Sequence, residues 1–342
     1  MKRVPHKETF AHHCDAVTAA TKFDDLLVEG EEPEATYKAF AKVLHPDAVD
    51  DRFYDEATSS VTRLNTLWDE YNGKNVGASG PKTITTKKRT YVLSGDLIEG
   101  SVANLYLSAY REDDKTANAW LKMPRSPKDS DLLDREVKAL KSLDSPDYRH
   151  FAPTLIETFR HKDAATNTIR RVNAIEPLTG FYSVAEIKEA YPQGLDPKDV
   201  AWMWRRLFVA CGLAYDNGLV HGAITPENVM VHPAMHGVVL IDWCYSCRDD
   251  QTIPALVPGR RGMYPPSVFD KKPPTHAVDV AMAAQTMKWL MGDKLTRPFS
   301  AFARGCAVSS PPKPSELLGE FDELIDRLWG PRKYRAFEMP PT

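Results

Sequence analysis

The chain has 342 residues, a formal net charge of −3 and 27% charged residues. This length exceeds that of one compact core and predicts two or three domains. The balanced charge gives no basic surface of the kind that nucleic-acid binding requires, so we expect no nucleic-acid partner. No apolar run approaches the ~18 residues that span a bilayer, and the five scattered cysteines are typical of reduced thiols. We therefore expect a folded cytoplasmic protein that makes no membrane contact.

Helical patterns dominate the chain up to about residue 72. We expect three helices, over about 14–28, 34–44 and 52–71. In the second, apolar side chains recur at the i, i+3, i+4 and i+7 positions of one helical face, and the third carries a longer stripe of the same kind. Pro46 disfavours helical geometry at His45, so the second helix is expected to end there.

The tripeptide His45-Pro46-Asp47 lies between the last two of these predicted helices. In this arrangement, residues 10–72 resemble a J-domain, a small all-α module whose exposed His-Pro-Asp loop contacts a DnaK-type chaperone. The resemblance implies that His45, Pro46 and Asp47 contact such a chaperone and stimulate its ATPase. The other interpretation is that the tripeptide is only a helix stop followed by a turn.

Residues 73–82 are rich in glycine and small polar residues and predict a flexible linker. The composition changes after this linker. Strand-like patterns dominate 83–178, whereas 179–342 is mostly helical with one pair of short strands. The linker therefore separates a small helical module from a larger part of mixed composition.

The pair of short strands carries two candidate metal ligands. Two β-branched runs flank a loop that contains Pro233 and Gly237, which predicts a hairpin. Asn228 directly precedes the first run and Asp242 follows the second, so both lie at the open end of an antiparallel pair. Amide and carboxylate oxygens are suitable ligands for Mg²⁺ between phosphates. The sequence therefore predicts a magnesium site at Asn228 and Asp242.

The same residues match a known signature. His221, Asn228 and Asp242 keep the order of the kinase pattern H-R-D-L-x-x-x-N followed by D-F-G, and the spacing from His to Asn is preserved. The chain from about residue 83 to 300 thus resembles a protein kinase domain. The resemblance implies that this part binds ATP and Mg²⁺.

The resemblance also implies a fold. We expect an α+β, bilobal, protein-kinase-like architecture with an N-lobe over 83–178 and a C-lobe over 179–342. The J-domain-like residues 10–72 would form a separate, small all-α module in front of it.

Two further residues fit the kinase pattern. The sequence Ala-Trp-Leu-Lys ending at Lys122 resembles V-A-I-K, whose Lys holds the α- and β-phosphates. Glu136 lies on the apolar face of a predicted helix over about 131–143, and a carboxylate there needs a partner because an unpaired buried charge is costly. We expect Lys122 to be that partner. The resemblance thus assigns Lys122, Glu136 and His221 to the catalytic site.

The nucleotide would also contact residues outside this pair. Gly100 stands near the turn of a predicted hairpin that resembles the glycine-rich loop over the phosphates. Residues 173–178 resemble the hinge between the lobes, which places Glu176 and Leu178 beside the adenine. Gly100, Lys122, Glu176 and Leu178 are therefore the expected nucleotide-binding residues.

One residue of the signature is missing. The Asp that serves as catalytic base falls at Ala223, and alanine cannot accept the proton of a substrate hydroxyl. Losing such a group typically costs ~10²–10⁴-fold in rate. Thr225 and Glu227 are candidate substitute bases, but no geometry readable from the sequence supports either. We therefore expect a pseudokinase, a regulator or scaffold that binds ATP and Mg²⁺ and carries a J-like co-chaperone module.

Two alternatives remain open. One is a weakly active phosphotransferase whose acceptor is a protein or a small molecule, because phosphoryl transfer depends mainly on positioning and charge. The other is a co-chaperone of a DnaK-type ATPase whose kinase-like part presents a client protein.

Other features give less specific expectations. Asp196 followed by proline predicts the start of a helix that ends near Asn217. Asp279 resembles the Asp of the central helix in a kinase lower lobe. Arg260 is expected to be an exposed loop charge, and the last forty residues form a helical tail without recognisable chemistry.

Overall fold

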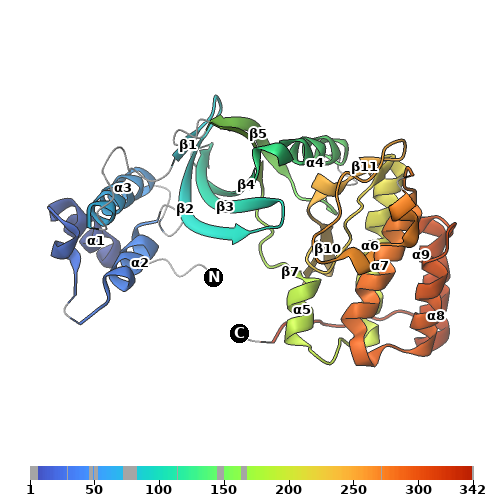
Figure 1. The fold of residues 1–342 in the computed structure, drawn as a ribbon. Helices are drawn as coiled ribbons and strands as arrows, with labels where there is room; N and C mark the ends of the chain where they lie inside the picture. Colours follow the sequence, from blue (N-terminus) through green and yellow to red (C-terminus); the bar gives the residue numbers. More distant parts are fainter. Residues whose placement is uncertain are drawn as a thin grey trace. The chain divides into compact units, whose positions relative to one another are not determined.

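The computed structural model describes residues 7–28, 30–45, 49, 53–71, 83–113, 115–144, 150–162, 168–270 and 272–340 (Figure 1). The chain divides into two compact units. The first unit contains residues 1–125 and 159–175, and the second contains 126–158 and 176–342. Within the described ranges, no helix is both long enough and apolar enough to cross a membrane.

The first unit begins with helical elements. They are α1 (Lys7–Ala19), the 3₁₀ turn η1 (Phe23–Leu26), α2 (Pro33–Leu44) and α3 (Tyr54–Tyr71). The expected bounds of α2 and α3 agree with these to within two residues. The helix expected over 14–28 was wrong, because α1 begins earlier and ends at Ala19. The Asp25 carboxylate accepts the backbone N–H groups of Thr21 and Lys22, which turns the chain out of the helix.

The three helices enclose a hydrophobic core of their own. Leu44, Leu64 and Leu67 have no exposed surface, which confirms the apolar faces expected for α2 and α3. The Trp68 ring stacks on those of Tyr37 and Tyr71, with centroids 4.9 and 5.8 Å away. The buried members are Phe10, Cys14, Val17, Ala20, Phe23, Leu26, Leu44, Ala57, Val61, Leu64 and Leu67.

The predicted His-Pro-Asp loop is described only at its first residue. His45 follows α2 directly, with an extended backbone at φ −62° and ψ 136°. This geometry agrees with the helix stop that Pro46 predicts. Pro46, Asp47 and the predicted linker 73–82 lie outside the described residues.

A six-stranded sheet follows in the first unit, with strand order β1-β2-β3-β4-β6-β5. The pairings β1–β2, β2–β3, β3–β4 and β4–β6 are antiparallel, and the sheet curls so that the ring of Tyr91 on β2 stacks on Phe159 of β5, 5.9 Å away. The strands are β1 (Thr83–Thr85), β2 (Thr90–Glu99), β3 (Ala103–Glu112), β4 (Lys115–Pro124), β5 (Leu155–Lys162) and β6 (Ile169–Ile175).

The second unit is mainly helical. Its helices are α4 (Ser130–Ser142), α5 (Val184–Ala190), α6 (Pro197–Asp216), α7 (His276–Met291), α8 (Arg297–Cys306) and α9 (Pro314–Trp329). Helix α6 packs against both α7 and α9. Its first turn is capped by the Asp196 side chain, which accepts the N–H of Lys198 at 2.8 Å, as the Asp-Pro start predicts.

Short strands complete the second unit. The pairs are β8 (Leu219–Val220) with β11 (Cys247–Arg248), and β9 (Val229–His232) with β10 (Gly237–Leu240). A third strand, β7 (Tyr182–Ser183), pairs with β9 on its other side. The mixed content of the chain is thus α+β, with a curled antiparallel sheet in one unit and a mainly helical second unit.

Candidate functional site

The hairpin β9–β10 places Asn228 and Asp242 at its open end. Val229 pairs with Leu240, and the N–H of Ile241 donates to the carbonyl of Asn228 at 3.0 Å. This bond extends the ladder by one step, so Asp242 follows directly after the last paired residue. The predicted convergence of an amide and a carboxylate at one end of the hairpin is therefore present in the backbone register.

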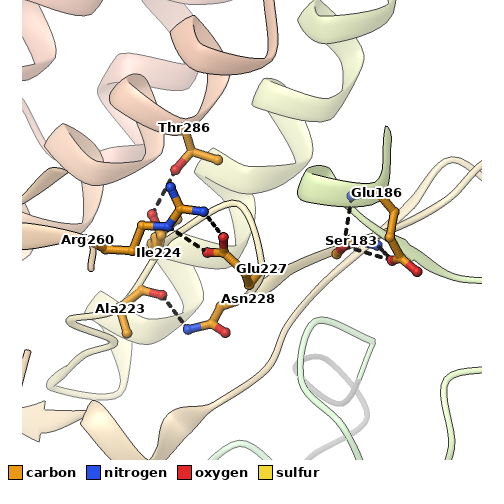
Figure 2. Close-up of polar contacts among 8 residues, drawn as sticks. All are labelled: Ser183, Glu186, Ala223, Ile224, Glu227, Asn228, Arg260 and Thr286. Atoms are coloured by element: carbon orange, nitrogen blue, oxygen red, sulfur yellow. Dashed lines mark hydrogen bonds and ion pairs between the residues drawn. The ribbon is translucent and has the colours of Figure 1, made fainter. Parts of the chain in front are cut away.

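The side chain of Asn228 is held in one orientation. It is 4% exposed, and its Nδ2 donates to the carbonyl of Ala223 at 3.0 Å (Figure 2). This bond identifies Nδ2 as the donor and leaves Oδ1 as the atom for a cation. Amide and carboxylate oxygens are among the ligand types of Mg²⁺, whose other ligands are typically phosphate oxygens and water.

Asp242 has an unusual backbone. Its φ of 65° and ψ of 43° lie in the left-handed region, which non-glycine residues rarely adopt. The 3₁₀ turn η5 (Trp243–Tyr245) follows at once, and Trp243 Nε1 donates to the carbonyl of Leu240 at 2.7 Å. Such strain persists only where surrounding contacts enforce it, and it is concentrated at functional sites.

His221 ties the loop 221–228 to the end of β10. Its ring is buried and lies edge-on to Trp243, with centroids 4.5 Å apart. The N–H of Ala223 points at Nδ1 at 3.2 Å, which makes Nδ1 the acceptor. Nε2 therefore carries the proton and donates to the carbonyl of Ile241 at 3.0 Å. The imidazole thus fixes the residue that directly precedes Asp242.

Asp279 on α7 holds the start of the same loop. Its two carboxylate oxygens accept the backbone N–H groups of His221 at 2.8 Å and Gly222 at 2.9 Å. Burial raises the pKa of Asp279 to about 6, against the lowering effect of these two hydrogen bonds. Gly222 has a φ of 69°, so the turn requires glycine.

Ala223 stands where the kinase resemblance places the catalytic Asp, and this position is inaccessible to solvent. Ala223 has no exposed surface, and its carbonyl accepts both Asn228 Nδ2 and the N–H of Thr225. Thr225 is buried, and the Glu227 carboxylate is bound by the Arg260 guanidinium through two hydrogen bonds (Figure 2).

The Arg260–Glu227 pair was not predicted from the sequence, where Arg260 was expected to be an exposed loop charge. The two side chains are 32% and 43% exposed. The turn that presents Arg260 is itself anchored, because the N–H of Val257 donates to the hydroxyl of the buried Tyr264 at 3.0 Å. A second tether of the loop was also missed: Thr286 Oγ1 donates to the carbonyl of Ile224 at 2.8 Å.

Two predicted nucleotide-binding residues lie in the first unit. Lys122 is 3% exposed on β4, where it is paired with Leu105 of β3 and Asn173 of β6. Gly100 begins the turn between β2 and β3, as expected, and a Cβ there would overlap the carbonyl oxygen of Ala103. Glycine is therefore required at that turn.

Three other predicted site residues lie in the second unit. Glu136 is 1% exposed on α4, which confirms that this carboxylate lies on the buried face of its helix. Helix α4 packs against η5, the turn that follows Asp242. Glu176 is exposed and Leu178 half-buried just after β6, and the N–H of Glu176 donates to the carbonyl of Thr154 at 3.0 Å. The Lys122–Glu136 pairing stays a prediction.

The cysteines form no metal centre. All five are free and buried, and burial raises the pKa of Cys247 to about 12. Across the ranges that the structure describes, no three His, Cys, Asp or Glu side chains gather as metal ligands. A cation at Asn228 and Asp242 would therefore depend on oxygens from a bound phosphate.

Known proteins resemble this chain over part of its length. Calcium/calmodulin-dependent protein kinase type 1 of Macrobrachium nipponense is 27% identical over 194 residues, and the Caenorhabditis elegans protein of the same name is 24% identical over 212 residues. The matches cover 56% and 60% of this chain, but 53% and 57% of those kinases. The chain thus spans little more than half the length of these relatives.

No protein-family model matches the chain. The chain is distantly similar to protein kinases over part of its length, and its architecture is compatible with a kinase-like fold.

Proposed function

We propose that the kinase-like part binds ATP with Mg²⁺ and acts as a pseudokinase, a regulator or scaffold that responds to nucleotide. The observation that supports this proposal is that the expected metal ligands are present while the expected catalytic base is not. The Asn228 side chain donates to the Ala223 carbonyl, which would leave its oxygen for a cation, and the strained Asp242 lies at the same end of the hairpin, whereas the base position holds the buried Ala223. The site thus retains groups that hold a nucleotide and lacks the group that accepts the proton.

Different residues of the chain would bind Mg²⁺ and the phosphates of ATP. Asn228 Oδ1 and the Asp242 carboxylate would hold Mg²⁺, and Lys122 would offset the charge of the phosphates. His221 and Asp279 act through other residues, because they fix the loop and the strand end that carry the two ligands. Mg²⁺, when bound, neutralises the charge of the phosphate oxygens.

The direct test is titration of the full chain with ATP, with and without Mg²⁺, in parallel with an assay of γ-phosphate transfer. We expect binding that requires Mg²⁺ and no transfer. Asp242→Ala removes a charged ligand and should weaken binding by about tenfold or more, and Lys122→Ala should do the same.

Asp249→Ala is the matched control for this test. Asp249 is exposed and makes no hydrogen bond or ion pair to any residue that the structure describes. Its replacement should leave ATP binding unchanged. An absence of ATP binding by the unmodified chain would reject the proposal.

The main alternative is a slow phosphotransferase. It is supported by the same ligand geometry, because positioning and charge supply most of phosphoryl-transfer catalysis. Transfer that both Asp242→Ala and Lys122→Ala abolish would favour this enzyme over the pseudokinase. The acceptor, a protein or a small molecule, would then be identified by supplying each class in turn.

A co-chaperone role for the N-terminal helices is a separate proposal. It is supported by the three helices with their own core and by the extended backbone of His45 at the end of α2. We expect the full chain to stimulate the ATPase of a DnaK-type chaperone, and His45→Gln to abolish that stimulation. No stimulation by the unmodified chain would reject the role, together with client presentation.

A further inference from the structure

The last described part of the chain packs on the second unit without forming a helix or strand. Helix α9 ends at Trp329, and Gly330 turns the chain with a φ of 75°. Residues 331–338, which we name the strap, have no regular secondary structure. Phe337 within the strap is nevertheless 5% exposed, so this segment is held by its side chains.

An arginine anchors the strap to the start of α6. Arg335 Nε lies 2.8 Å from Asp199 Oδ1, and its Nη2 lies 3.5 Å from Asp196 Oδ2. Asp199 is buried, and this burial raises its pKa against the lowering effect of Arg335. A buried carboxylate needs a compensating charge. Arg335 supplies one from a segment more than a hundred residues away in the chain.

Aromatic rings make a second anchor. The His236 ring stacks on Trp202 of α6, with centroids 4.1 Å apart and planes 3° apart. Tyr334 of the strap stacks on the same imidazole, with centroids 4.9 Å apart. The hydroxyl of Tyr191, just after α5, donates to the carbonyl of Glu338 at 2.9 Å. The strap therefore contacts α5, α6 and the turn that contains His236.

His236 connects this contact to the candidate ligands. It belongs to the turn between β9 and β10, where its φ of 50° is left-handed. The opposite end of the same hairpin carries Asn228 and Asp242, and each strand is four residues long. A contact that immobilises the turn also limits motion of the strand ends, because the ladder between them is continuous.

We propose that the strap is a detachable clamp on the β9–β10 hairpin, which keeps Asn228 and Asp242 in place for their ligand. The first part of this proposal concerns the hairpin alone, and only its effect on ligand binding rests on the proposed nucleotide function. Release of the strap would break side-chain contacts alone, because no backbone ladder holds the segment, and it would expose Phe337 and separate Asp199 from Arg335. Its release would be a means to weaken the ligand site without altering any ligand.

Hydrogen exchange in the full chain tests the clamp. Arg335→Ala removes the ion pairs to Asp199 and Asp196, and Lys333→Ala is the matched control, because Lys333 makes no hydrogen bond or ion pair with the described residues. We expect Arg335→Ala to speed amide exchange in the hairpin 229–240, whose amides are hydrogen-bonded, by about fivefold. Exchange in α8 should stay unchanged in both variants.

The stacking of Tyr334 on His236 could hold the strap in place even in Arg335→Ala, so a second variant is needed. Tyr334→Ala removes the ring over His236, and the double variant removes both anchors. Unchanged hairpin exchange in the double variant would overturn the clamp, and so would equal effects of Arg335→Ala and Lys333→Ala.

The effect of the strap on ligand binding at Asn228 and Asp242 is measured separately, as the affinity of each variant for Mg²⁺–ATP. Arg335→Ala should weaken it by several-fold if the unmodified chain binds. Faster hairpin exchange with unchanged affinity would overturn this effect. Absence of ATP binding in the unmodified chain would reject the nucleotide function, while the exchange data would still decide the clamp.

Discussion

Asp279 and Gly222, which are 57 residues apart in the chain, are joined by a buried hydrogen bond of 2.9 Å. The bond forms because Gly222 adopts a left-handed backbone that turns its N–H toward α7. The same carboxylate takes the N–H of His221, so one side chain sets the path of the loop before Ala223. The loop therefore depends on a residue type at 222 and on two acceptor oxygens at 279.

Replacing Gly222 should destabilise the protein. In Gly222→Ala, an L side chain in the left-handed region costs about 1–2 kcal/mol, and its Cβ would lie 3.2 Å from the carbonyl oxygen of Tyr245. Urea unfolding should show a loss of about this size. Gly262→Ala is the control, because a Cβ there meets nothing within 4 Å, and its effect should be much smaller. Equal losses would contradict the requirement at Gly222.

Asp279→Asn should lower stability in a way that depends on pH. An amide offers one acceptor oxygen in place of two, and a backbone N–H left unpaired costs about 1–3 kcal/mol. Burial raises the pKa of Asp279 from 3.8 to about 6, so the folded state binds this proton more tightly than the unfolded state. The contribution of Asp279 to stability therefore falls as pH rises from about 4 to 6.

The difference in unfolding free energy between the unmodified chain and Asp279→Asn should accordingly narrow over that window. Urea titrations at pH 4.5, 5.5 and 7 measure it. A difference that widens with rising pH would mean that the two hydrogen bonds outweigh burial and lower the pKa of this carboxyl.

The Arg260–Glu227 pair should make a modest contribution that depends on salt. Both side chains are partly exposed, and pairs of this kind contribute about 0.2–1 kcal/mol. A double-mutant cycle with Glu227→Gln and Arg260→Ala measures the coupling energy, which should shrink in 1 M salt because charges are screened. Arg261 is the control partner, since its guanidinium lies over the Phe269 ring. If the coupling energy between Glu227 and Arg261 were as large as that between Glu227 and Arg260, the interaction would not be specific to Arg260.

Leu64→Ala should loosen the N-terminal helices selectively. Leu64 has no exposed surface in the core that α1, α2 and α3 share, and such truncations cost about 2–5 kcal/mol. Hydrogen exchange should rise in α3 and not in α6, whereas Ser59→Ala, at an exposed position on α3, should change neither. Equal acceleration in α6 would show that the helical core is not independent of the second unit.

The features best predicted from the sequence are those determined by residues close together in the chain. The hairpin that carries Asn228 and Asp242, the capped start of α6 and the buried face of α4 all follow from residue spacing within one element. Helix α1 was misplaced because its end is set by the Asp25 carboxylate rather than by apolar periodicity.

Contacts between distant segments were not predictable in the same way. Arg260 and Arg335 have no local signal that names their partners, because Glu227 and Asp199 become neighbours only when the chain folds. For the same reason, the sequence of the last forty residues gave no indication of which residues they contact. In the structure, Arg335 is a principal anchor of the strap.

The burial of all five cysteines makes the folded chain well suited to chemical labelling. Thiol reagents attack the thiolate, and burial hides all five sulfurs and raises the pKa of Cys14, Cys211, Cys247 and Cys306. A cysteine introduced at Gly262, where a side chain has open space, should then be the one site that a maleimide dye modifies in the native protein. A dye at that position would report on the segment that presents Arg260, in a protein whose own cysteines need not be replaced.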